Sequence, residues 1–124
     1  MPSVLMINLP EKKRNQLHVL SIRMNFACRE ILPQEVGCRI SDLLRGKTDN
    51  CAGAVRFRDE MLIMDGFSGQ DLNFLLNEMF RTHNTVALKA VTTPTNITWT
   101  VAMLHAQLTA ENREMNSRRT EARL

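Results

Sequence analysis

The sequence predicts an α/β fold with a four-stranded, mainly parallel sheet and helices packed on it. Short apolar runs alternate with longer segments of helical periodicity, which is the pattern of strand-helix units. The runs at residues 4–9 and 61–67 are the most apolar and should form the central strands. The two halves of the chain also share one order of elements: strand, helix, strand, helix.

The first half-repeat covers residues 1–46. It opens with a strand over residues 3–9 and a helix over residues 11–24, which Asn25 can stop. The helix should turn one apolar face toward the core. That face carries Leu17, Leu20 and Met24, with Val19 and Ile22 beside them.

The rest of this half is more polar. Residues 26–32 predict an edge strand, because Arg29 and Glu30 interrupt its apolar character. A short helix over residues 35–45 should end at Gly46, a typical C-terminal cap. Its inward residues are expected to be Val36, Ile40, Leu43 and Leu44. Residues 47–60 join the halves as a loop, in which residues 54–57 can add a short strand.

The second half-repeat covers residues 61–108. Its first strand, over residues 61–67, ends in a turn at Asp65-Gly66, and Ser68 follows as a helix N-cap. Asn84 can end that helix in the left-handed conformation. One apolar stripe should face the sheet, made of Leu72, Leu75, Leu76, Met79 and Phe80.

The last helix follows a second strand over residues 86–91. Pro94 breaks the chain after this strand, so Thr95 or Asn96 can cap the helix. One apolar stripe consists of Ile97, Val101, Leu104 and Leu108, and a second consists of Trp99, Ala102, Met103 and Ala106. A helix with two apolar sides needs two covers. Either the first half or a second copy of the chain covers the second stripe, and residues 109–124 should continue as a polar helical tail.

We therefore expect a single domain over residues 1–124 that arose as a degenerate duplication, with strand order 2-1-3-4 and helices on both faces. The motif VLMINL at residues 4–9 aligns with MLIMDG at residues 61–66. A two-layer sandwich with a mixed sheet is the alternative.

A resemblance to a known family supports the second half. The segments MDGF at residues 64–67 and LKAVTTPTNITWT at residues 88–100 resemble a family of short bacterial proteins catalogued as a domain of unknown function. The similarity covers residues 60–108. It implies the same strand, turn, helix and strand order, and it implies no catalytic residues.

Composition and charge disfavour several function classes. The net charge is +3, and the excess lies in the first half, above all at Lys12-Lys13-Arg14. No aromatic platform interleaves this patch, so we expect a solvated face and no nucleic-acid partner. No stretch approaches the ~18 consecutive apolar residues of a membrane span. His18, His83 and His105 lie apart and the nucleotide-binding glycine motifs are missing, so we expect no metal and no cofactor.

The three cysteines, Cys28, Cys38 and Cys51, show no C-x-x-C spacing. An odd number of cysteines without an export signal predicts reduced thiols in a cytoplasmic protein. Cys38 near a helix start is either a reactive thiol or a buried structural residue.

The sharpest candidate ligand site lies between the first and third strands, where the strand order reverses. Asn8 and Asp65 follow these strands and would share one crevice in a parallel sheet. Gly66, Ser68, Thr93, Thr95 and Asn96 should lie nearby, and free N–H groups at helix starts can hold an anion. Ordinary turn and cap chemistry explains the same residues equally simply.

Three functions remain open. We favour a non-enzymatic interaction or regulatory module that forms a homodimer through the last helix, at Trp99, Ala102, Met103 and Ala106, and that can act with a protein partner. The second is a small-ligand or anion sensor using the Asn8 and Asp65 crevice. The third is an enzyme of unknown type, for which the sequence offers no catalytic constellation. Trp99 can alternatively stack on a ligand or belong to the core.

Overall fold

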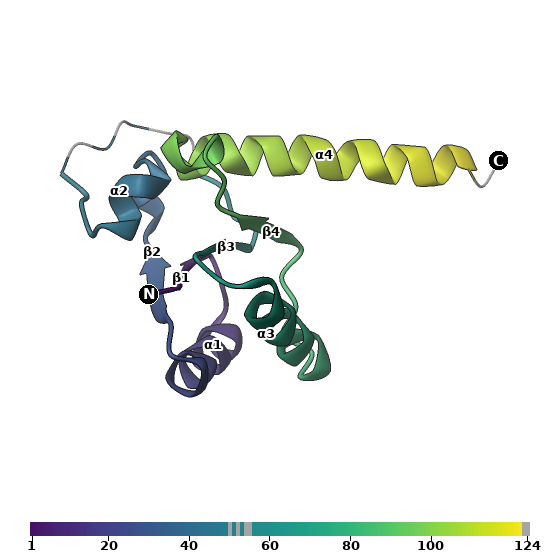
Figure 1. Ribbon diagram of the computed structural model, residues 1–124. Coiled ribbons are helices and arrows are strands. Elements are labelled where there is room, and N and C mark those ends of the chain that lie inside the picture. The colour runs from purple at the N-terminus through teal and green to yellow at the C-terminus, as the bar shows by residue number, and fades with distance from the viewer. Residues whose placement is uncertain (50, 52, 54–55, 123–124) are drawn as a thin grey trace.

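A four-stranded sheet forms the centre of the computed structural model, which describes residues 1–49, 51, 53 and 56–122, with side chains as far as residue 113 (Figure 1). The strands β1 (Ser3–Ile7), β2 (Ala27–Ile31), β3 (Met61–Asp65) and β4 (Leu88–Val91) lie in the order β2-β1-β3-β4. The helices are α1 (Glu11–Met24), α2 (Ile40–Leu44), α3 (Gly69–Arg81) and α4 (Val101–Ala122), with 3₁₀ turns η1 (Pro33–Glu35) and η2 (Asn96–Thr98). The α/β class and the strand order are confirmed.

The central strand pair runs in opposite directions. β1 pairs with β2, and β3 with β4, in parallel, but β1 and β3 are antiparallel. Ser3 lies opposite Asp65, and Ile7 lies opposite Met61. The sheet is mainly parallel as predicted, with an antiparallel centre that the prediction lacked. Because β1 and β3 are antiparallel, their carboxyl ends lie at opposite edges of the sheet.

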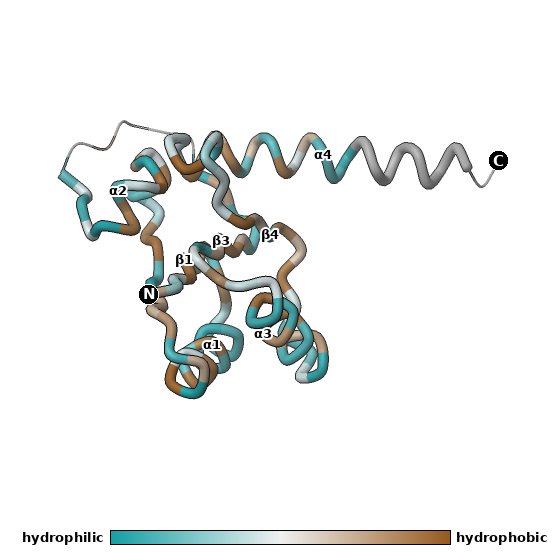
Figure 2. The backbone as a smooth tube through the Cα atoms, in the orientation of Figure 1, coloured by the Kyte–Doolittle hydropathy of each residue, from teal (hydrophilic) through white to brown (hydrophobic). Residues whose placement is uncertain are grey.

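Each face of the sheet has its own apolar core, because successive strand residues point to opposite sides. Helices α1 and α3 cover one face, and α2 and α4 cover the other (Figure 1). Figure 2 shows the central strands as largely hydrophobic. The first core includes Val4, Met6, Leu62, Met64, Leu17, Leu20, Leu75 and Met79. The second includes Leu5, Ile7, Met61, Ile63, Val36, Cys38, Ile40, Leu43, Val101 and Leu104. Helices thus cover both faces, so the alternative is wrong in its two layers, although the mixed sheet that it included is correct.

Local end signals place most helix boundaries where the sequence predicts them. The Ser68 hydroxyl oxygen accepts the Asp71 N–H at 3.1 Å. Asn25 and Gly46 have positive φ angles of 63° and 75° at the ends of α1 and α2. The end of α3 differs, because His83 rather than Asn84 takes the left-handed conformation. Asn84 is buried and its N–H bonds to the Met79 carbonyl at 2.8 Å, which completes a Schellman motif.

Three apolar residues that were expected in or beside the inward-facing stripes are exposed instead. Phe80 is 74% exposed, and on α1 the exposed fractions of Val19 and Ile22 are 55% and 83%. A helix packed on a sheet buries only the stripe that faces the strands, and these side chains lie at or beyond its margin. Leu72 and Leu76 are half-buried, whereas Leu75 and Met79 are fully buried.

The element expected over residues 35–45 is divided. The turn η1 comes first, and α2 begins only at Ile40. Between them, the backbone of residues 36–40 bonds to the start of α4 instead of continuing as a helix. In the join, residues 54 and 55 lie outside the described residues, and residues 56 and 57 form no strand.

Candidate functional site

The start of α4 is held by residues 36–40, which we call the clamp segment. The first N–H groups of a helix have no partner within it. Here the Val101 N–H donates to the Cys38 carbonyl at 3.2 Å, and the Ala102 N–H donates to the Val36 carbonyl at 2.9 Å. Ile40 N–H also donates to the Trp99 carbonyl at 2.9 Å. The first half of the chain therefore supplies the partners that fix α4 in place.

The side-chain cap of α4 also differs from the prediction. The hydroxyl oxygen of Thr100 accepts the Met103 N–H at 3.1 Å. Thr95 and Asn96 lie earlier, at the turn η2, so neither caps α4. The physical reason is that the 3₁₀ turn delays the start of the helix to Val101.

The two apolar stripes of α4 have different surroundings. The stripe of Ile97, Val101, Leu104 and Leu108 packs against the sheet as predicted, on the face that α2 also covers. The second stripe, which consists of Trp99, Ala102, Met103 and Ala106, is covered only in part. Trp99 and Ala102 are half-buried, whereas Ala106 is exposed and Met103 is 54% exposed. The first half of the chain therefore covers only part of the second stripe.

An open apolar groove marks the uncovered part. Its volume is about 360 Å³, and Trp99, Met103, Ala106 and Gln107 line it. We call these four residues the α4 face. Figure 1 shows that α4 begins over the sheet and continues well past it. The α4 face is thus an apolar surface at the start of α4, whose first turn is hydrogen-bonded to the clamp segment.

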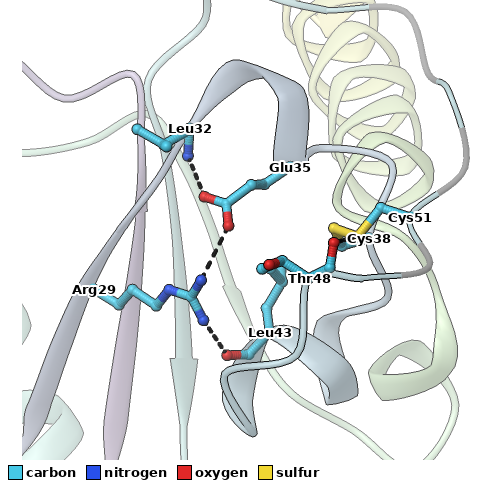
Figure 3. The surroundings of a disulfide bond; sticks show 7 residues. All are labelled: Arg29, Leu32, Glu35, Cys38, Leu43, Thr48 and Cys51. Atoms are coloured by element: carbon cyan, nitrogen blue, oxygen red, sulfur yellow. Dashed lines mark hydrogen bonds and ion pairs between the residues drawn. A yellow bond between two sulfur atoms is a disulfide. The ribbon is translucent and has the colours of Figure 1, made fainter.

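A disulfide joins Cys38 to Cys51, with their Cα atoms 4.3 Å apart (Figure 3). The prediction of reduced thiols is wrong for these two residues and leaves Cys28 as the free thiol. Counting cysteines could not find the pair, because the chain must fold back over the join to bring residue 51 to the clamp segment. Closing a loop of this length stabilises the fold by roughly 3 kcal/mol in the chain-entropy account.

An ion pair between half-buried Arg29 and buried Glu35 lies near the disulfide (Figure 3). Arg29 of β2 contacts the Glu35 carboxylate at 3.0 Å and donates to the Leu43 carbonyl at 2.8 Å. The other Glu35 oxygen accepts the Leu32 N–H at 2.8 Å. These bonds tie the edge strand to η1 and to α2, on either side of the clamp segment.

The predicted crevice does not form as one site. Asn8 follows Ile7 and Asp65 ends β3, so the antiparallel pairing places them at opposite ends of the sheet. The Asn8 side chain donates to the Phe57 and Asp59 carbonyls at 2.8 and 3.1 Å. Asn8 therefore links the join to the end of β1 through two hydrogen bonds.

The other predicted ligand residues lie around the carboxyl ends of β3 and β4, and many of their polar groups bond to one another. The Thr92 hydroxyl donates to the Asp65 carboxylate. Thr93 N–H donates to the Asn96 side chain at 2.8 Å, and Asn96 N–H donates to the Thr93 hydroxyl at 3.0 Å. Gly66 supplies the turn with a φ of 78°, Ser68 caps α3, and the Thr95 carbonyl accepts the Thr98 hydroxyl at 3.2 Å. These bonds match ordinary turn and cap chemistry.

Sequence reasoning missed one contact that holds the join against α4. The His105 ring stacks on Phe57 with centroids 3.6 Å apart, and its Nε2 lies 2.8 Å from an Asp59 oxygen. Asn8 bonds to the backbone of the same two join residues. Nothing in the local sequence signals this contact, because its partners lie more than 40 residues apart.

Titratable groups supply little chemistry in the described part of the chain. Burial raises the pKa of the Cys28 thiol to about 11, which keeps this sulfur protonated and unreactive. Among the described residues, no group of three or more His, Cys, Asp and Glu side chains could hold a metal. Over the same residues, no helix has both the length and the hydropathy that crossing a bilayer requires.

Comparison with known proteins confirms the resemblance in the second half. Residues 60–115 match the family described as Domain of unknown function (DUF3783). The match begins just before β3 and ends within α4, so it includes the α4 face and excludes the clamp segment. Neither a curated protein nor a solved structure matches the chain.

Proposed function

We propose that this chain is a non-enzymatic interaction module that forms a homodimer through the α4 face. The observation that carries the proposal is the exposure of Met103, at 54%, in an apolar groove on a helix that extends past the sheet. Apolar groups arranged in this way lose contact with water when a second helix packs on them.

A second copy of the chain is the occupant that we propose. In an antiparallel pair of α4 helices with a two-fold axis between Ala106 and Gln107, Met103 packs on the partner's Ala110. The small side chains Ala106 and Ala110 are both exposed and allow close approach. Large residues then face small ones in both directions, as a self-complementary contact requires. The clamp segment holds α4 before association, which lowers the ordering cost.

Two glutamate substitutions test the proposal. Met103→Glu places a charge in the contact, where an unpaired buried charge is strongly unfavourable, and should give a folded monomer. Ile22→Glu on α1, where Ile22 is 83% exposed, is the matched control and should remain dimeric. Sedimentation velocity over a concentration series reports the state of each protein. A wild type that sediments as a monomer at high micromolar concentration would exclude the homodimer.

Two further inferences belong to this proposal. We infer that the halves arose by internal duplication, which their shared order of elements supports. We also propose a cytoplasmic location, in which the Cys38–Cys51 disulfide would be of the transient, catalytic or redox-sensing kind that occurs there.

A further inference from the structure

We infer that the Cys38–Cys51 disulfide controls the α4 face, so that oxidation favours the homodimer and reduction weakens it. The inference rests on the proposed function, since it names the regulation of the same surface. It starts from one shared residue. Cys38 forms the disulfide and also accepts, through its carbonyl oxygen, the N–H of Val101 in the first turn of α4.

The coupling extends over the whole clamp segment. Cys38 lies between Val36 and Ile40, whose backbone groups bond to Ala102 and Trp99 at 2.9 Å each. Arg39 and Thr100 add an antiparallel bridge between the same two segments. Trp99 lines the α4 face, so the residues bonded to the clamp segment include part of the proposed contact.

The disulfide limits how far this region can move. Cys51 comes from the join and is half-buried against the same core as Trp99 and Leu108. While the bond is intact, the clamp segment and the join cannot separate, and α4 keeps the partners for its first turn. After reduction, only non-covalent contacts hold Cys51, and the loop gains conformational freedom. The first turn of α4 then opens more often, which disfavours a contact that needs a fixed helix.

Reduction can start at the outer sulfur. Cys38 is 1% exposed, whereas Cys51 is half-buried and its Sγ lies 3.5 Å from the Thr48 carbonyl oxygen. A cellular dithiol attacks Cys51 Sγ as a thiolate, forms a mixed disulfide and releases Cys38 Sγ, which takes up a proton. The second thiol of the reductant, as its thiolate, then displaces Cys51 Sγ, which also takes up a proton. The dithiol becomes a disulfide, and its two electrons and two protons end on the two cysteines.

The test compares oxidised and reduced protein without requiring a substitution. Sedimentation velocity with and without a dithiol should show that reduction raises the dissociation constant of the dimer by about tenfold or more. Cys38→Ala/Cys51→Ser should match the reduced wild type in both conditions, and Cys28→Ser should respond like the wild type. An unchanged dissociation constant, or three titratable thiols when the oxidised protein is unfolded without reductant, would overturn the inference.

A second measurement separates this inference from the proposed function. Hydrogen exchange of the Val101 and Ala102 amides, measured in the Met103→Glu monomer, reports the clamp without any dimer. Faster exchange after reduction supports the coupling, and unchanged exchange overturns it. If the wild type is monomeric in both redox states, the homodimer and its redox control fall together. The exchange rates would then still decide whether the disulfide holds α4.

Discussion

Replacement of Leu75 by alanine tests whether α3 packs in the register described above. Leu75 has 0% exposure and lies in the core formed by α1, α3 and the sheet. Leu75→Ala removes three carbon atoms, and at about 0.8 kcal/mol per buried methylene this loses about 2.4 kcal/mol. The cavity left between the helices and the sheet adds a further term. We therefore expect a loss of about 3–4 kcal/mol in the free energy of unfolding, within the usual range for buried leucines.

The neighbouring Leu76 provides the control. It is half-buried and lines an open pocket with Phe80 and Lys89, so Leu76→Ala should cost only about 1–2 kcal/mol. Urea denaturation followed by circular dichroism gives both values. The Met103→Glu background avoids any contribution from self-association. For Leu75→Ala the melting temperature should also fall, by roughly 10–15 °C. A larger cost for Leu76→Ala than for Leu75→Ala would mean that α3 turns a different face to the sheet.

Three further predictions concern single contacts. Asn8→Ala should lower the free energy of unfolding by about 1 kcal/mol more than Asn8→Gly does. Both variants lose the bonds to the join, but only alanine is strained at a φ of 57°. Equal denaturation midpoints would show that backbone strain at this position does not matter. Glu35→Ala should cost about 1–3 kcal/mol, because Arg29 loses its carboxylate partner and the Leu32 N–H loses its acceptor. Glu35→Gln should cost less because it keeps an acceptor, and the reverse order in urea denaturation would contradict this. In Cys38→Ala/Cys51→Ser, native Cys28 should react with iodoacetamide at pH 8 at least about tenfold more slowly than after unfolding. Folding raises the pKa of the Cys28 thiol from 9.0 to about 11, so the stability that the buried thiol contributes is complete below pH 9 and is lost as the pH rises through 11. Fast alkylation of the native protein would instead show that Cys28 is an accessible thiolate.

The sequence by itself determined the elements and much of their arrangement. Periodicity and length separated strands from helices, and the most apolar runs identified β1 and β3 as central. Ser68, Asn25 and Gly46 marked helix ends correctly, because a cap depends on residues within one turn of it. The inner stripe of α4 was also correct, since a periodic apolar face must meet the core whatever the detailed topology is.

The tertiary structure decided what depends on contacts between distant residues. The antiparallel pairing of β1 with β3 separated Asn8 from Asp65, although the two occupy equivalent places in their halves. The return of the join brought Cys51 to Cys38, and the clamp segment took the place of a longer helix. The second stripe of α4 is half-buried where the first half of the chain contacts it and exposed beyond that contact. Such pairings are selected by the packing of the whole chain and leave no periodic signal in the local sequence.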